Sequence, residues 1–105
     1  MHKKHINPPT LFNSTDFGFS QIVVSPLGKM VCISGQVAWD EHRNIIGEND
    51  LKVQANKTLQ NLQTAIEAAG GTLKDIIMLR IYVVNYKDED GAIIGEALRT
   101  YASSV

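Results

Sequence analysis

The stretch LKVQANKTLQNLQTAIEAAGGTLKDIIMLRIYVV, residues 51–84, decides how this chain folds. In its first half, apolar residues recur at intervals of three and four, which places them on one side of an α-helix. These residues are Leu51, Ala55, Leu59, Leu62, Ile66 and Ala69. Asn49 or Asp50 can cap the start of the helix, and Gly70 with Gly71 can end it, because glycine adopts the left-handed conformation without steric cost. The sequence therefore predicts a helix over residues 51–69.

The second half ends in residues 76–84, which are predicted to form a central β-strand. Most of these residues are apolar, several are β-branched, and the run is too short for an independent helix. Apolar side chains fall on both faces of such a strand, because successive residues point to opposite sides. One face is expected to pack against the helix, and the other face needs a second cover.

A β-hairpin is predicted upstream of the helix. Residues 19–25 are rich in strand formers, Ser25-Pro26-Leu27-Gly28 has the composition of a tight turn, and residues 29–36 form the return strand. The return strand is largely apolar on both faces, so it too is expected to be covered twice. Cys32 lies in the middle of this strand without a nearby histidine, which favours a buried structural thiol over a nucleophile.

The rest of the chain completes an α+β pattern. The acidic residues 88–90 suit the start of a second helix, which carries an apolar stripe and runs to about residue 102. Residues 1–16, with two consecutive prolines, are interpreted as a surface arm, and residues 39–47 as a polar loop. The order strand, strand, helix, strand, helix predicts a sheet with both helices on one face. Further copies of the chain are expected to cover the other face.

Composition narrows the class of protein. A chain of 105 residues is expected to form a single domain over residues 1–105, and a net charge of −1 gives no basic field for nucleic acid. The single cysteine suits a reducing compartment. Because no apolar run reaches the roughly 18 residues of a membrane helix and no signal peptide is evident, a cytoplasmic protein is expected. His2 and His5 are weighed as metal ligands, but a poorly ordered terminus is favoured, and no metal is expected.

Several motifs, taken in order, resemble the Rid family, also called the YjgF or L-PSP endoribonuclease-like family. They are Phe19-Ser20-Gln21, residues 28–36 (GKMVCISGQ), residues 65–70 (AIEAAG), residues 73–76 (LKDI) and residues 80–86 (RIYVVNY). The resemblance covers about residues 17–101 and implies a chorismate-mutase-like α+β fold, assembled as a homotrimer with ligand clefts between subunits. It also implies hydrolytic deamination of reactive imines and enamines, such as 2-aminoacrylate, to keto acids and ammonia without a cofactor.

The resemblance places Phe19, Ser34, Gly35 and, on the second helix, Gly95 around the cleft as substrate-binding residues. Active members usually have a tyrosine where Phe19 stands, and many members have an asparagine where Gly95 stands. The family continues with two further strands, which carry an arginine for the substrate carboxylate and a glutamate associated with the attacking water. This sequence stops at Val105 without them, so it is interpreted as truncated, and its catalytic residues are unknown.

Alternatives stay open for several features. The chain is either a fragment of a longer family member, which is favoured, or a natural short form. Its function is either deamination or non-catalytic binding of small metabolites by a trimer. The missing arginine favours binding. Endoribonuclease activity has the least support, because the net charge is near zero. Ser34-Gly35-Gln36 either contacts a ligand or forms a strand end where glycine allows close packing. Arg80 is expected in an interface ion pair rather than on a ligand.

Overall fold

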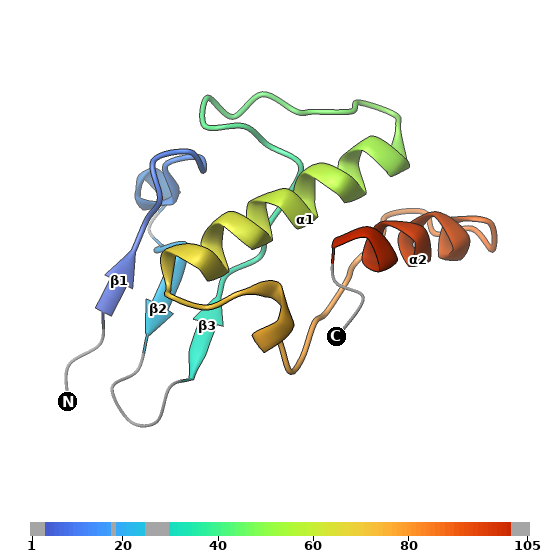
Figure 1. Ribbon diagram of the computed structural model, residues 1–105. Helices are drawn as coiled ribbons and strands as arrows, with labels where there is room; N and C mark the ends of the chain where they lie inside the picture. Colours follow the sequence, from blue (N-terminus) through green and yellow to red (C-terminus); the bar gives the residue numbers. More distant parts are fainter. Residues whose placement is uncertain (1–3, 18, 25–29, 102–105) are drawn as a thin grey trace.

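The computed structural model describes residues 4–17, 19–24 and 30–101, and these contain one antiparallel sheet and two α-helices (Figure 1). The sheet has the order β1 (Lys4–Ile6), β2 (Ile22–Val24), β3 (Val31–Ile33). The helices are α1 (Leu51–Ala68) and α2 (Asp90–Tyr101), with short 3₁₀ helices η1 (Ser14–Phe17) and η2 (Leu73–Asp75). The predicted α+β class is confirmed. Among these helices, none combines the length and the apolar character needed to cross a membrane.

The predicted hairpin is confirmed over a shorter length. β2 and β3 pair antiparallel, with Ile22 opposite Ile33 and Val24 opposite Val31. The predicted turn at residues 25–28 falls outside the described residues. The antiparallel register brings the residues just before β2 beside the residues just after β3.

β1 corrects the prediction that residues 1–16 form only a surface arm. It pairs with β2 as an antiparallel edge strand, with Ile6 opposite Ile22. Farther along the same segment, Leu11 and Phe12 are buried. The two prolines follow the strand rather than interrupt it, so the β-ladder is not broken by their missing N–H groups. The arm therefore contributes both a strand and part of the core.

Both ends of α1 are closed as the sequence predicts. Asp50 is the N-cap residue, and its side chain accepts a hydrogen bond from the N–H of Val53 at 3.1 Å. At the other end, Gly70 has a φ of +90°, and the N–H of Gly71 donates to the carbonyl of Ile66 at 3.0 Å. Glycine adopts such a φ with little penalty, so the chain can leave the helix here and turn toward η2.

Removing the cap of α1 is expected to weaken the fold measurably. Asp50→Ala should lower the free energy of unfolding by about 1 kcal/mol, because the N–H of Val53 loses its acceptor. Asp50→Asn keeps an acceptor oxygen and should stay close to wild type. Urea unfolding followed by far-UV circular dichroism gives both values. Equal losses for the two variants would show that the hydrogen bond at the cap contributes nothing.

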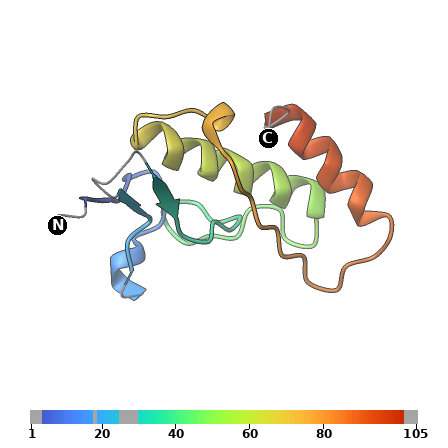
Figure 2. The ribbon, with the colours of Figure 1, turned by 90° about the horizontal axis from the view of Figure 1, so that it is seen from below.

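The core is built around the buried stripe of α1, which lies between the sheet and α2 (Figure 2). One cluster consists of Leu59, Leu62, Ile66, Leu73 and Ala97, with Val31 and Ile33 of β3 packed against it. A second cluster consists of Leu11, Ile22 and Ala65. α1 thus covers one face of the sheet, and α2 packs chiefly against α1.

The prediction of a central strand over residues 76–84 is wrong for the single chain. The segment connects η2 to α2 without joining a β-ladder, and no backbone hydrogen bond within the described residues joins residues 77–84 to another segment. Ile76 and Leu79 are half-buried against the core cluster, as expected of a side that faces the helices. A strand also needs a paired neighbour for its N–H and C=O groups, and no described segment supplies one.

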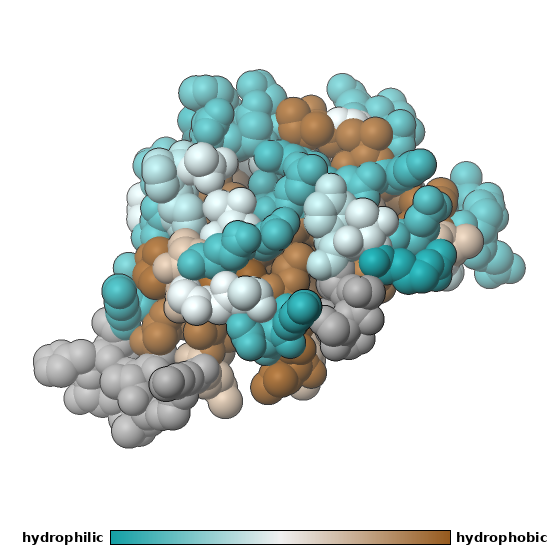
Figure 3. Space-filling model, viewed as in Figure 1, coloured by the Kyte–Doolittle hydropathy of each residue, from teal (hydrophilic) through white to brown (hydrophobic). Residues whose placement is uncertain are grey.

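The side of the sheet away from α1 and the segment 76–84 expose apolar side chains. Ile77 is 93% exposed and Tyr82 is 86% exposed. Cys32, predicted to be buried, is exposed because it points away from α1, whereas its neighbours on β3 pack toward the core. Figure 3 shows hydrophobic surface at the lower edge of the molecule beside η2. Burial of this side by further copies of the chain stays a prediction.

Candidate functional site

Three of the four predicted site residues lie at the same end of the hairpin. Ser34 follows β3 directly, and its N–H donates to the carbonyl of Gln21 at 3.0 Å, which continues the register of β2 and β3 by one residue pair. The motifs Phe19-Ser20-Gln21 and Ser34-Gly35-Gln36 therefore run past each other. The antiparallel pairing is the physical reason that two motifs distant in sequence meet here.

The side chains of this end are joined by a hydrogen-bond network around Gln21. The Gln21 amide is buried, and its Nε2 donates to the carbonyl of Phe12 at 3.1 Å. Its Oε1 accepts from Gln36 Nε2 at 2.8 Å. The hydroxyl of Ser34 lies 3.1 Å from the Gln21 carbonyl oxygen and 3.4 Å from Gln21 Oε1. Sequence reasoning named Ser34 but missed this amide; the signal was a glutamine that ends each of the two motifs.

Gly35 lies next to open space. A Cβ placed on it would meet no atom within 4 Å outside its immediate neighbours. The interpretation of Gly35 as a point of close packing is therefore not supported within the described chain. Phe19 is half-exposed, and its ring packs edge-to-face on Phe12 with 6.1 Å between the centroids. Phe19 thus supplies an apolar ring, and Gly35 an open position next to Ser34 in the chain.

An aromatic cluster of Phe12, Phe17, Phe19 and Trp39 borders this end of the hairpin. Phe12 is at its centre, with its ring centroid 5.1 Å from Trp39 and 5.9 Å from Phe17. The guanidinium of Arg43 lies 5.8 Å from the ring centroid of Phe17, a cation–π distance. Of these four residues, only Phe19 was predicted from the sequence to be a site residue. The signal for Phe12 and Phe17 was the recurrence of phenylalanine before β2.

The polar loop at residues 39–47 is confirmed, and Asp40 organises it. Its carboxylate accepts from the N–H groups of His42 and Asn44, both at 2.9 Å. These hydrogen bonds, first of all the one from the Asn44 N–H, hold the pKa of the Asp40 carboxyl below its ordinary value. The carboxyl therefore has a lower pKa in the folded state than in the unfolded state. Its contribution to the stability of the fold is present above the ordinary pKa of aspartate and is lost as the pH falls through the lower, folded-state pKa. The geometry gives Asp40 a structural role in the loop.

Gly95 is not brought together with the other predicted site residues in the single chain. It lies on α2 and borders an open, mainly apolar groove of about 540 Å³. The groove is lined by Ile81, Tyr82, Val83, Tyr86, Gly91, Ile94, Gly95 and Leu98. None of these residues belongs to the hairpin, and α2 packs chiefly against α1. A cleft that includes Gly95 and Ser34 would have to be completed by another copy of the chain.

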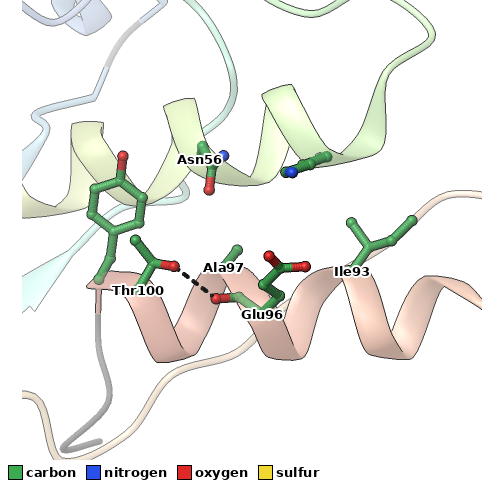
Figure 4. Close-up of a pocket in the computed structure, with 7 residues that line it drawn as sticks. Asn56, Ile93, Glu96, Ala97 and Thr100 are labelled. Atoms are coloured by element: carbon green, nitrogen blue, oxygen red, sulfur yellow. Dashed lines mark hydrogen bonds between the residues drawn. The ribbon is translucent and has the colours of Figure 1, made fainter.

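A second, smaller pocket lies between α1 and α2 (Figure 4). Its volume is about 70 Å³, and it is lined by Lys52, Asn56, Ile93, Glu96, Ala97, Thr100 and Tyr101. The Thr100 hydroxyl donates to the backbone carbonyl of Glu96 at 3.0 Å. Pockets that hold metabolites are commonly about 300–1,000 Å³, so this one is too small for such a ligand.

Cationic and metal-ligating residues add no second site in the described part of the chain. Arg80 is exposed and makes no ion pair with any described residue, so its predicted interface pair would need another chain. The described residues contain no group of three or more His, Cys, Asp or Glu placed to hold a metal ion. His5 Nδ1 lies 3.0 Å from the Ser20 hydroxyl, and His2 falls outside the described residues.

Comparison with known proteins gives a consistent result. A family model described as Endoribonuclease L-PSP matches residues 14–104. A crystal structure of YyfB from Yersinia pestis, a protein of unknown function of the conserved Rid protein family, is 37% identical. The match covers 96% of this chain and 77% of the Yersinia chain, with a TM-score of 0.67. An Entamoeba histolytica structure that carries the endoribonuclease L-PSP name is 17% identical over 94% of this chain and 75% of its own, with a TM-score of 0.75, and supports the fold alone.

Proposed function

Because this chain belongs to the Rid family of L-PSP endoribonuclease-like proteins, we propose that it hydrolyses reactive 2-imino and enamine acids, such as 2-aminoacrylate, to keto acids and ammonia. The observation that carries the proposal is that the antiparallel register pairs Gln21 with Ser34, so that Phe19, Ser34 and Gly35 lie at the same end of the hairpin. These residues offer an apolar wall, a hydroxyl and open space. The reaction is assigned to the protein chain alone, without a metal or an organic cofactor.

The main contribution of the protein to this reaction is to position the substrate and the attacking water. Water adds to the carbon of the C=N bond, the resulting carbinolamine releases ammonia, and a keto acid remains. Holding the imine carbon near an ordered water is mainly an entropic contribution. The Phe19 ring can pack against the substrate side chain, and the Ser34 oxygen can contact the nitrogen or the water. No general base is assigned within residues 1–105.

The proposed assembly is a cytoplasmic homotrimer in which the single-domain chains complete each other's clefts. Two observations support it. Gly95 borders a groove separate from the hairpin end of the same chain, and the segment 76–84 exposes apolar side chains beside that groove. Large exposed apolar patches are uncommon in monomers. The single cysteine and the near-neutral charge fit a reducing compartment and a small-molecule ligand rather than nucleic acid.

A direct assay tests the deaminase proposal. A pyridoxal-dependent dehydratase acting on serine or threonine generates the 2-amino enamine and imine acids, and release of the keto acid is followed in the presence of the chain. We expect release faster than the uncatalysed rate, and a loss of about tenfold in Ser34→Ala, the order expected for one lost contact to a charged or strongly polar group. No acceleration by the wild-type chain would contradict the proposal.

Non-catalytic binding of small metabolites is the second candidate function. It is favoured by the absence, among the described residues whose hydrogen bonds to Ser34 are shown, of a titratable side chain suited to activate water. Calorimetry with 2-oxobutanoate distinguishes the two functions. Binding without turnover of the corresponding imine supports the binding protein, whereas turnover supports the enzyme.

A further inference from the structure

The two motifs at the site are joined by one buried amide. The side chain of Gln21 has 0% exposure, and it connects the Phe12 carbonyl on one side to Gln36 on the other. The backbone N–H of Gln21 donates in turn to Asn7 Oδ1 at 2.7 Å. A buried amide whose groups are all hydrogen-bonded rigidifies its surroundings, because any displacement would leave polar atoms unpaired in a medium of low dielectric.

This arrangement determines whether the Ser34 hydroxyl donates or accepts in a hydrogen bond with a ligand. A hydroxyl has one proton to donate and lone pairs that accept. Gln21 offers two acceptors to that proton, its carbonyl oxygen at 3.1 Å and Oε1 at 3.4 Å. With the proton directed to either oxygen of Gln21, the Ser34 oxygen has only lone pairs left for a ligand. Gly35, the next residue, borders open space.

We propose that Gln21 is a positioning residue that fixes the Ser34 hydroxyl as a hydrogen-bond acceptor, so that the site prefers ligands presenting an N–H donor over ligands presenting a carbonyl oxygen. This inference rests on the proposed function and deepens it. The substrate of deamination carries an N–H group, which the Ser34 oxygen can accept, whereas the keto acid product carries only an acceptor at the same carbon. The site therefore retains the imine and releases the ketone.

A matched pair of probes tests the preference. The probe 2-aminobutanoate presents N–H donors beside its carboxylate, and 2-oxobutanoate presents a carbonyl oxygen at the same position. By calorimetry, the wild-type chain should bind the amino acid more tightly than the keto acid. Ser34→Ala should weaken binding of 2-aminobutanoate on the order of tenfold and change that of 2-oxobutanoate less than about twofold. Equal losses for both probes, a larger loss for the keto acid, or no binding of either probe would overturn the inference.

A double-mutant cycle tests whether Gln21 acts through Ser34. Gln21→Met removes Oε1 but keeps the backbone carbonyl of residue 21, so it should lower the preference for the amino acid in part in the wild-type background. It should leave the preference unchanged when added to Ser34→Ala, while its effect on thermal unfolding appears in both backgrounds. Asn61→Leu is the matched control, because Asn61 is also a buried amide, donating to the carbonyls of Val37 and Trp39. It should cost stability without changing the preference.

The outcomes separate this inference from the proposed function. Loss of preference in Asn61→Leu, or an undiminished effect of Gln21→Met in the Ser34→Ala background, would overturn the positioning role even if the chain deaminates imines. Conversely, the expected probe pattern without keto acid release in the dehydratase assay would support the positioning role and contradict the enzyme. If Gln21→Met does not fold, the inference is tested by the affinities of wild type and Ser34→Ala for the two probes.

Discussion

The double variant Ile77→Lys/Tyr82→Lys is expected to convert the proposed homotrimer to a monomer. Both side chains are almost fully exposed in the single chain, at 93% and 86%, and both lie in the segment 76–84, which lacks a paired neighbour. Burial of an apolar side chain of this size contributes about 1.5–3 kcal/mol, so the pair should weaken association by at least about 10²-fold. Lysine also blocks strand edges from pairing. Sedimentation velocity at micromolar concentration measures the change.

The matched control for this prediction is Ile45→Lys. Ile45 is also an exposed apolar residue, but it lies in the polar loop of residues 39–47, opposite Trp39 in an isolated bridge. It should leave the oligomeric state unchanged. Dissociation by the control variant as well would place the interface elsewhere. A wild-type protein that sediments as a monomer would contradict the proposed homotrimer itself.

Elements whose determinants are local in sequence were predicted well. α1 begins and ends within a residue of its prediction, because the cap Asp50, the apolar spacing and Gly70 all lie within the helix or next to it. The segment 76–84 has the composition of a strand but depends on a neighbour that residues 4–17, 19–24 and 30–101 do not provide. The prediction that Cys32 is buried was wrong for the same reason, since burial on the side of β3 away from α1 requires a second layer of structure. A single sequence does not specify where such a layer comes from.

In the candidate site, too, the residues placed by local structure were predicted well, and the residue whose place depends on another chain was not. Phe19, Ser34 and Gly35 lie at the same end of the hairpin because the antiparallel register of β2 and β3 determines their positions. Gly95 lies on the other side of α1, and its place in a shared cleft depends on assembly. The buried amide of Gln21 was missed, although a glutamine ends each of the two motifs, because glutamine at a strand end is usually exposed.

Ile22→Ala is expected to cause the largest loss of stability in the chain. Ile22 is fully buried, and it packs with Leu11 and Ala65 in the second core cluster. It also pairs with both neighbouring strands, opposite Ile6 and opposite Ile33. Truncating a buried isoleucine to alanine typically costs about 2–5 kcal/mol, through lost transfer free energy and the cavity left behind. Against a total of about 5–15 kcal/mol for a domain, that loss removes a large share of the stability.

The effect of Ile22→Ala should reach the site, because Gln21 is the next residue and its amide depends on the packing of β2. Urea unfolding gives the free energies. Ile22→Val should cost only about 0.5–1.5 kcal/mol, because it leaves a smaller cavity. Val53→Ala, at a residue exposed on α1, is the matched control and should stay within about 0.5 kcal/mol of wild type. If Ile22→Ala costs no more than Val53→Ala, β2 does not pack in the core, and the hairpin cannot hold Ser34 and Gly35 in the arrangement that supports the proposed function.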